Sequence, residues 1–139
     1  MTYDDGNIFA RILRGEIPCH KVFEDDLTFA FMDISPISRG HTLVLPKARA
    51  RNILDVTPDV LAATIVTVGR VARAAKAAFE AEGVAIMQFN ESPAGQSVFH
   101  LHFHVVPRWA GVALEPHGGP MEKPEILGEH AERMRAAFV

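Results

Sequence analysis

Three histidines alternate with large apolar residues in one short stretch of the chain, His100-Leu101-His102-Phe103-His104. Successive side chains of a β-strand point to opposite faces, so a strand over this stretch would set the imidazoles in a row, about 6.6 Å apart from one to the next. The apolar residues between them point the other way and can be buried. Imidazoles are costly to desolvate and contribute little to a core, so we expect these three to serve chemistry.

Three interpretations of this histidine row are open. The first is a solvent-exposed face that happens to be rich in histidine, which the strict alternation of three histidines makes the least expected. The second is a zinc site, because His-x-His on a strand can present two nitrogens to Zn²⁺, although the strand carries no carboxylate to orient them. The third is nucleophilic catalysis, in which one imidazole attacks an electrophile and its neighbours bind the charge that develops.

The segment before the histidines, residues 90–97, is a turn-rich connection with the sequence NESPAGQS. Gly95 permits unusual backbone angles and the close approach of a ligand. The amides that follow it, with the side chains of Gln96 and Ser97, can form a small anion-binding concavity. A regular strand would point Ser97 away from the histidine face unless the backbone turns there. Beside three histidines, this segment favours nucleophilic catalysis over a plain turn.

Residues 95–107, with the sequence GQSVFHLHFHVVP, resemble the signature of the histidine triad (HIT) superfamily, in which three histidines alternate with apolar residues. The Gly-Gln-Ser-Val start is similar to that of the Hint branch, which comprises purine nucleoside phosphoramidases. The resemblance extends upstream, in the family's order and approximate spacing, through residues 7–9, 15–18, 31–36 and 40–47. It covers residue 7 to about residue 108, and the C-terminal segment 109–139 matches less clearly.

The resemblance implies catalytic roles for five residues. His102 is the expected nucleophile, which attacks the α-phosphorus of a nucleotide and forms a nucleotidyl-histidine intermediate that water then hydrolyses. A neutral imidazole persists at pH 7 and is a good leaving group in the second step. His104 and His100 are expected to flank the phosphate and to neutralise its oxygens without a metal ion. His41 matches the family's supporting fourth histidine, and Ser97 matches the residue near the leaving group.

The resemblance also implies a purine nucleotide site. Asp33 matches the carboxylate that accepts both ribose hydroxyls, and Asn90 matches an amide near the sugar or the phosphate. From the residues alone, Phe9 and Phe31 are more often core than ligand contacts, and Asp33 can be a turn carboxylate. The residues expected to bind nucleotide, which include an apolar slot for the purine ring, are Ile8, Phe9, Ile12, Phe31, Asp33, Ile34, Asn90, Gly95, Gln96, Ser97, Val98, His102 and His104.

Some bacterial HIT proteins bind zinc through a Cys-x-x-Cys pair around the first helix. Those positions here read Asn7-Ile8-Phe9-Ala10, and Cys19 is the one cysteine of the chain. We therefore expect no structural metal and no cofactor.

Length and composition fit one domain over residues 1–139, and the resemblance implies that its core is residues 7–108. The 139 residues are 48% hydrophobic, which suffices for one sizeable core. A formal net charge of −3 gives no electrostatic footprint for nucleic acid or for an anionic membrane. No apolar run approaches the ~18 residues that span a bilayer. The acidic start does not resemble a signal peptide and a single cysteine cannot form an internal disulfide, so a cytoplasmic location is expected.

The spacing of apolar residues predicts an α+β fold. Asn7 is expected to cap a short helix that Gly15 closes, and Thr57 and Pro58 to begin a long helix that Gly83 ends. The apolar stripe of the long helix is expected to comprise Leu61, Ile65, Val68, Ala72, Ala75 and Phe79. The other predicted elements are strands at 21–24, 27–31, 41–45, 84–89 and 96–106, a mobile loop at 115–124 and a last helix at 124–138.

By its resemblance, the chain is expected to form a five-stranded antiparallel sheet with one long and one short helix. Two copies are expected to dimerise through the long helix and a sheet edge into a continuous sheet. The expected activity is metal-independent cleavage of nucleoside 5′-phosphoramidates of the AMP-amine type. Dinucleoside polyphosphate hydrolysis, nucleotide binding in a regulatory or scaffold protein, and zinc-dependent hydrolysis are the alternatives. An apolar slot reads little of the purine edge, so the sequence does not distinguish adenine from guanine.

Overall fold

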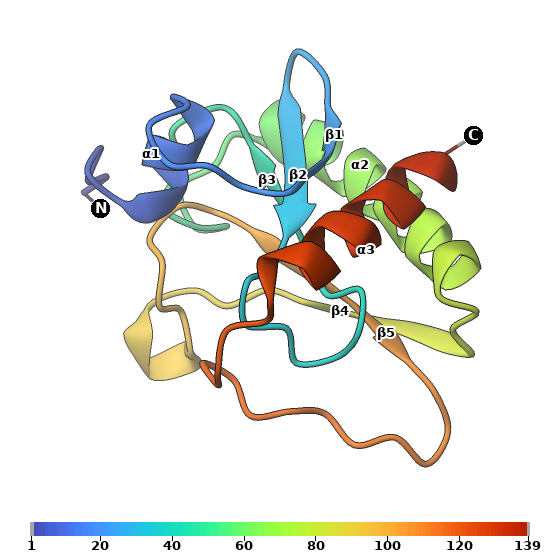
Figure 1. The fold of residues 1–139 in the computed structure, drawn as a ribbon. Helices are drawn as coiled ribbons and strands as arrows, with labels where there is room; N and C mark the ends of the chain where they lie inside the picture. The colour runs from blue at the N-terminus through green and yellow to red at the C-terminus, as the bar shows by residue number, and fades with distance from the viewer. Residues whose placement is uncertain (1, 139) are drawn as a thin grey trace.

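The structure of the protein is a computed structural model that describes residues 2–138, and it has an α+β architecture built on one sheet (Figure 1). The five strands run antiparallel in the order β1-β2-β3-β5-β4, which confirms the predicted fold class. In chain order the elements are α1 (Ile8–Leu13), β1 (Lys21–Glu24), β2 (Thr28–Met32), β3 (Thr42–Pro46), α2 (Pro58–Ala78), β4 (Gly83–Met87), the 3₁₀ turn η1 (Ser92–Ala94), β5 (Phe103–Arg108) and α3 (Pro124–Ala136).

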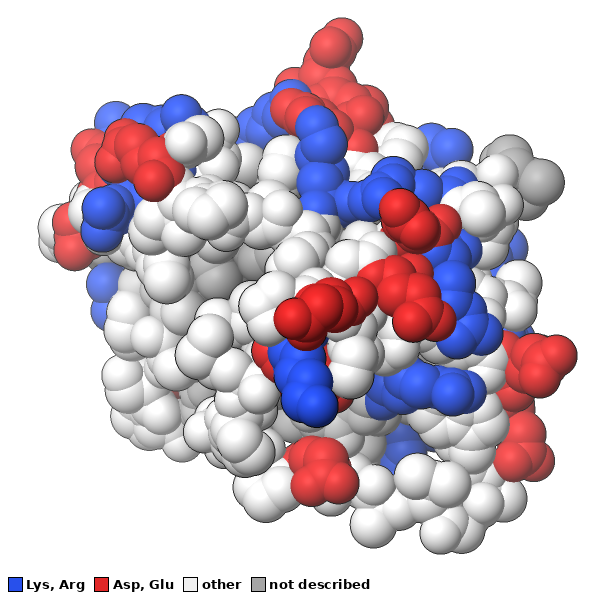
Figure 2. All heavy atoms as spheres, in the orientation of Figure 1, with Lys and Arg blue, Asp and Glu red and all other residues white. Residues whose placement is uncertain are grey.

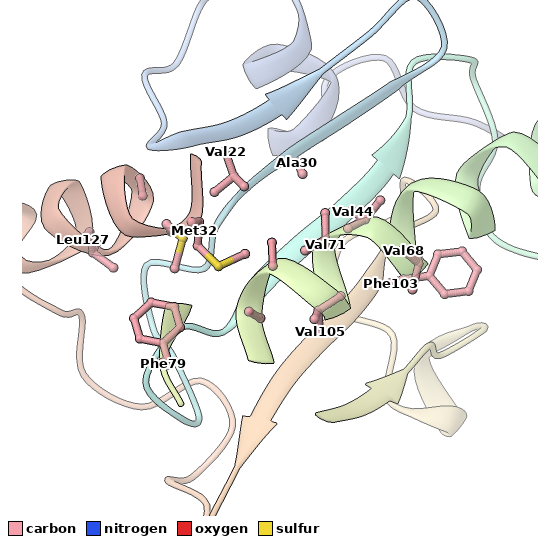
Figure 3. Close-up of a cluster of buried hydrophobic side chains, with 14 of the residues drawn as sticks. Val22, Ala30, Met32, Val44, Val68, Val71, Phe79, Phe103, Val105 and Leu127 are labelled. Carbon is pink, nitrogen blue, oxygen red and sulfur yellow. The ribbon is translucent and has the colours of Figure 1, made fainter. Parts of the chain in front are cut away.

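The two faces of the sheet bury different side chains, because strand residues alternate between faces. One face packs against α2 and α3, and its core includes Met32 of β2 with Phe103 and Val105 of β5 (Figure 3). The opposite face packs against α1 through the cluster Phe9, Ile12, Phe29, Phe31, Leu43 and Leu45. Leu43 pairs with His104 in the register of β3 with β5, so His104 lies on this second face. The histidine face is therefore covered by α1 instead of being open to solvent.

The buried stripe of α2 differs from the prediction at several positions, since Val68 and Ala75 are buried as expected but Thr64, Thr67, Val71 and Ala74 complete the stripe. Ile65 is 47% exposed, whereas Thr64 and Thr67 are buried. Both hydroxyls have partners within the fold: Thr67 Oγ1 lies 2.8 Å from Thr28 Oγ1 on β2, and Thr64 Oγ1 donates to Val60 O at 2.8 Å. Because their hydrogen bonds are satisfied, these threonines can replace aliphatic residues in the core.

The end of α2 also differs from the prediction. The helix ends at Ala78, and Gly83 is the first residue of β4. Side chains distant in sequence satisfy the last carbonyls: Arg133 donates to Ala78 O at 2.9 Å, and Trp109 Nε1 donates to Phe79 O at 3.2 Å. The helix itself ends in a local cap: Glu80 has a φ of 50°, in the left-handed region, and Ala81 N donates to Lys76 O at 3.0 Å, so Glu80 takes the place in which glycine is usual. At the start, Pro58 is the first helical residue as predicted, but Thr57 makes no side-chain capping bond.

The histidine strand is shorter than predicted, because β5 begins at Phe103 and not at residue 96. The preceding residues follow the segment after β3 without a regular ladder: Leu101 N donates to Ala50 O at 2.8 Å, and His100 Nε2 lies 2.8 Å from Pro46 O. Only His104 of the three histidines is in the strand. The other predicted elements are present with ends shifted by a few residues, and α3 ends at Ala136.

The charged side chains are distributed without a dominant sign. On the face drawn in Figure 2, basic and acidic residues are interspersed over α3 and the tip of the β1–β2 hairpin. This agrees with the net charge of −3 and gives no basic surface on that face for a polyanion. Within residues 2–138, none of the helices combines the length and the apolar character needed to cross a membrane.

Candidate active site

A cavity of about 260 Å³ lies between α1, the segment after β2 and the histidine segment. It brings together most of the residues assigned to nucleotide binding: Ile8, Phe9, Ile12, Phe31, Asp33, Ile34, Ser97, Val98, His102 and His104. A second, more open groove of about 590 Å³ lies beside α3 and has no triad histidine in its wall. The smaller cavity is therefore the candidate active site.

The apolar part of the cavity is a rigid slot built on α1 and β2. Asn7 Oδ1 accepts a hydrogen bond from Ala10 N at 2.9 Å, which caps α1 as predicted and fixes its position. Phe9 of this helix packs edge-on against Phe31, with ring centroids 5.4 Å apart, and against His102 at 4.8 Å. Phe9 and Phe31 are thus core residues that also line the cavity.

The hydrogen bonds of His102 fix its tautomer. Its Nδ1 lies 2.7 Å from the carbonyl oxygen of His100, and a carbonyl can only accept, so Nδ1 carries the proton and donates it. Burial lowers the pKa of His102, with an opposing effect from this hydrogen bond, and the neutral ring is favoured. In the neutral ring, Nε2 then has a free lone pair. His102 lines the cavity, so this ring can supply a nucleophilic nitrogen there.

A chain of hydrogen bonds fixes the tautomer of His104 in the opposite sense. The backbone N–H of Ile37 donates to His41 Nδ1 at 3.1 Å, so His41 must carry its proton on Nε2. His41 Nε2 lies 3.0 Å from His104 Nδ1 and donates to it. The neutral His104 ring therefore carries its proton on Nε2. His104 can offer that N–H as a donor to an oxygen in the cavity, beside a neighbour, His102, that offers a lone pair.

Burial keeps these imidazoles uncharged. It lowers the pKa of His41 to about 4, with smaller contributions from His117 and His102. It lowers the pKa of His104 to about 3, with smaller contributions from His102 and His41, and Asp33 acts in the opposite direction. A site of neutral imidazoles suits a substrate that brings its own negative charge, because that charge then favours N–H donors around it.

Asp33 is a turn carboxylate that also lines the cavity. Its Oδ1 accepts from Ser35 N at 2.8 Å. Its Oδ2 lies 3.5 Å from His41 Nε2. Asp33, His41 and His104 offer ligand atoms within 4.8 Å of one another. A metal on His41 Nε2 would leave that ring without a proton, because Ile37 N–H occupies Nδ1. The contacts are those of a hydrogen-bonded relay, and they fit a metal poorly.

His100 is not at the cavity. It is 1% exposed, its Nε2 donates to Pro46 O at 2.8 Å, and its Nδ1 accepts from the hydroxyl of Tyr3 at 2.5 Å. Both ring nitrogens are thus occupied away from the site. What His100 supplies is its carbonyl oxygen, which holds His102. The geometry does not place this ring beside a phosphate, and Tyr3, which anchors it, carries no signal in the sequence.

Three other predicted residues also lie outside the cavity wall. Asn90 accepts from Ile53 N at 2.8 Å and pairs with Gln88. Gln96 is buried, accepts from Asn52 Nδ2 at 3.0 Å and donates to Val98 O at 3.0 Å. Gly95 closes η1 with a φ of 105°, which favours glycine. The contacts of these residues shape the connection before the triad.

Two cavity residues come from segments without regular structure. Ser97 faces the cavity because the chain bends at residues 98–100 before β5 begins, which resolves the orientation problem posed by a regular strand. His117, on the segment after β5, also lines the cavity and lies 5.7 Å from His104 between ring centroids. Nothing in its sequence surroundings indicated a site residue, since it stands in a Gly/Pro-rich loop far from the triad.

An apolar slot lined by a lone-pair nitrogen, an N–H donor and a carboxylate is typical of a small-molecule site in which a few polar groups fix the ligand. The family model described as the HIT domain matches residues 14–111 of the chain. The protein therefore belongs to the HIT family, whose members are in general nucleotide hydrolases or transferases.

Similar proteins span most of the chain. The crystal structure of a HIT-like protein from Bartonella henselae, with an unknown ligand, is 47% identical, covers 99% of this chain and 100% of that one, and has a TM-score of 0.93. A hypothetical histidine triad nucleotide-binding protein from Sulfolobus tokodaii is 30% identical, with coverages of 93% and 89% and a TM-score of 0.85. Adenylylsulfatase HINT3 from Arabidopsis thaliana is 33% identical over 128 residues, which cover 88% of this chain and 65% of that protein.

Proposed function

We propose that this protein hydrolyses nucleoside 5′-phosphoramidates of the AMP-amine type, without a metal ion, through a nucleotide bound covalently to His102. The observation that carries the proposal is the tautomer of His102, whose Nδ1 is held by the His100 carbonyl at 2.7 Å while Nε2 stays free. The purine is proposed to occupy the slot beside Phe9 and Phe31, and Asp33 to accept the ribose hydroxyls.

In the first step, the lone pair of His102 Nε2 forms a bond to the α-phosphorus, and the phosphorus–amine bond breaks. The imidazole becomes positively charged, and the hydrogen bond from Nδ1–H to the His100 carbonyl stabilises that charge. The N–H on His104 Nε2, set by the relay from Ile37 through His41, donates to a non-bridging phosphate oxygen.

In the second step, the oxygen of a water molecule forms a bond to the phosphorus of the nucleotidyl-histidine, the bond to Nε2 breaks, and the proton that the water loses passes to solvent. His102 leaves as a neutral imidazole, which regenerates the starting tautomer. His41, His102 and His104 need no change of protonation between turnovers, in keeping with the lowering of their pKa values by burial.

Two other substrates share this chemistry and differ in the group that leaves. The similarity to an adenylylsulfatase favours an adenylyl sulfate as one candidate, although the chain spans only 65% of that relative. A dinucleoside polyphosphate is the other. Both would give the same covalent adenylate on His102. A regulatory protein that only binds nucleotide would give none.

The test is to measure kcat/KM for an adenosine phosphoramidate, diadenosine triphosphate and adenylyl sulfate, and to look for an adenylate adduct by intact-protein mass spectrometry. We expect the phosphoramidate to be the best substrate, and the adduct to be absent in His102→Ala. A ranking led by either other substrate would reassign the leaving group. Tight AMP binding without turnover of any of the three would favour the binding protein.

We further propose that two copies associate through α2 and β4. Within the described residues, β4 is an edge strand of the sheet and has neighbours on one side only. Apolar side chains stay exposed on both elements: Ile86 on β4 is 43% exposed, and Ile65 and Val66 on α2 are 47% and 63% exposed. An open edge strand beside exposed apolar residues favours pairing with a second copy.

A further inference from the structure

The loop between β5 and α3 delivers a histidine to the active-site cavity. His117 lines the cavity together with Gly118, and its side chain is exposed. The loop is tied to the segment after Asp33 by two backbone hydrogen bonds, from Glu115 N to Ile37 O and from Glu122 N to Ile34 O, both 2.8 Å long. His117 therefore stands on a loop that is fixed at both ends to the wall of the site.

His117 lies on the side of the cavity formed by His104 and Phe89, whereas Phe9 of the apolar slot packs against His102. The His117 ring centroid lies 5.7 Å from that of His104 and 6.4 Å from that of Phe89. The apolar slot beside Phe9 is on the wall formed by α1, which leaves the exposed mouth for the group that departs. Attack by His102 requires the leaving group to lie opposite the nucleophile, away from the His102 ring. An exposed side chain at the mouth of the cavity, such as His117, can reach a leaving group in that position.

An amine leaving group needs a proton, because an amide anion is a very poor leaving group. The buried histidines do not supply it, since burial lowers the pKa of His41 to about 4 and of His104 to about 3. Burial also raises the pKa of the Cys19 thiol, which makes that cavity residue a weak acid. Imidazole is the side chain whose charge ordinarily changes near neutral pH, and His117 is the exposed imidazole among the described residues of the cavity wall.

We propose that His117 is the acid that protonates the leaving amine, an inference that rests on the phosphoramidase function proposed above. As the bond from His102 Nε2 to phosphorus forms, the electron pair of the phosphorus–amine bond goes to the amine nitrogen. That nitrogen takes the proton of the His117 imidazolium, and His117 becomes a neutral imidazole. A proton from solvent restores the imidazolium before the next turnover.

The charged and titratable groups around His117 are consistent with this role. From the cavity, Asp33 contributes a carboxylate, while His41, His102 and His104 are neutral rings. Two further carboxylates, Glu115 and Glu122, stand on the same loop. The bound phosphoramidate adds another negative charge to this side of the cavity.

The experiment compares two substrates that share the adenylate and differ in their need for a proton. One is the AMP phosphoramidate of a primary alkylamine, and the other is the p-nitrophenyl ester of AMP, whose phenolate leaves without protonation. For His117→Gln, we expect kcat/KM for the alkylamide to fall about 100-fold or more, and kcat/KM for the ester to change less than about threefold. AMP affinity should be unchanged. His20→Gln, a histidine outside the cavity wall, is the matched control and should behave as wild type.

Equal losses on both substrates would overturn the acid role and make His117 a general positioning residue. No loss on either substrate would also overturn it. Both results would leave the proposed function intact, because wild type would still form the adenylate on His102. If wild type cleaves neither substrate and forms no adduct, the phosphoramidase proposal fails and this inference fails with it.

Discussion

Replacing His41 tests the relay that sets the tautomer of His104. His41 is 0% exposed, accepts from Ile37 N–H at 3.1 Å and donates to His104 Nδ1 at 3.0 Å. In His41→Ala, nothing holds the His104 proton on Nε2, so the donor to the phosphate is no longer preorganised. Loss of one such donor costs about 10²–10³ in kcat, or about 2.7–4 kcal/mol. Because neutral His104 still populates the useful tautomer, we expect a loss near 10²-fold, at the lower end.

The assay separates catalysis from binding and from folding. We expect kcat for an AMP phosphoramidate to fall while the Kd for AMP, measured by calorimetry, changes less than about threefold. The unfolding free energy should fall by about 1–3 kcal/mol for the unsatisfied Ile37 N–H alone, with a further loss from the space left by the ring. His41→Gln should recover at least tenfold of the activity, because the amide carries an acceptor and a donor on one carbon, as the imidazole does. A kcat for His41→Ala within threefold of wild type, in a folded protein, would refute the relay.

Four further outcomes are expected. His102→Ala should lose many orders of magnitude in turnover and keep AMP binding, whereas His100→Ala should retain measurable activity, since the nucleophile remains. A His102→Ala enzyme within about tenfold of wild type, or ~1.4 kcal/mol of barrier, would show that His102 is not the nucleophile. The protein should lose stability as pH falls from about 6.5 toward 4, by up to about 1.4 kcal/mol per pH unit for each of His41 and His104. These histidines bind protons in the unfolded chain over this range but not in the folded protein, where their pKa values are about 4 and about 3. A melting temperature that does not change with pH over this range would show that the two rings are charged in the folded protein. Exhaustive chelation should leave activity unchanged, and a loss restored by Zn²⁺ would contradict the proposed mechanism. Light scattering should give twice 15.3 kDa, and Ile86→Glu should shift the measured mass toward that of the monomer; a dimer that survives this substitution would contradict an interface at β4.

The sequence predicted the sheet and the residue types of the cavity well, because both depend on local patterns. Alternation in β2 sets Phe31 on the face opposite Met32, and the same alternation in β5 sets His104 opposite Phe103 and Val105. Where the prediction failed, partners distant in sequence decided the structure. At the end of α2, Arg133 and Trp109 bind the last carbonyls while Glu80 adopts the left-handed conformation expected of a glycine, and the hydrogen bond of Leu101 N to Ala50 O accompanies the late start of β5.

The different hydrogen-bonding environments of the three triad histidines could not be predicted from the sequence. In the alternating motif, His100, His102 and His104 look equivalent, and a regular strand would give them one environment. The bend at residues 98–100 breaks that equivalence, because it turns the His100 ring toward Tyr3 and Pro46 while its carbonyl faces His102 Nδ1. A backbone acceptor then defines His102 as the lone-pair donor, and a backbone donor, Ile37 N–H, acts through His41 to define His104 as the N–H donor. The opposite tautomers of His102 and His104 thus follow from two main-chain groups, the His100 carbonyl and the Ile37 N–H, whose positions the pattern of side chains does not encode.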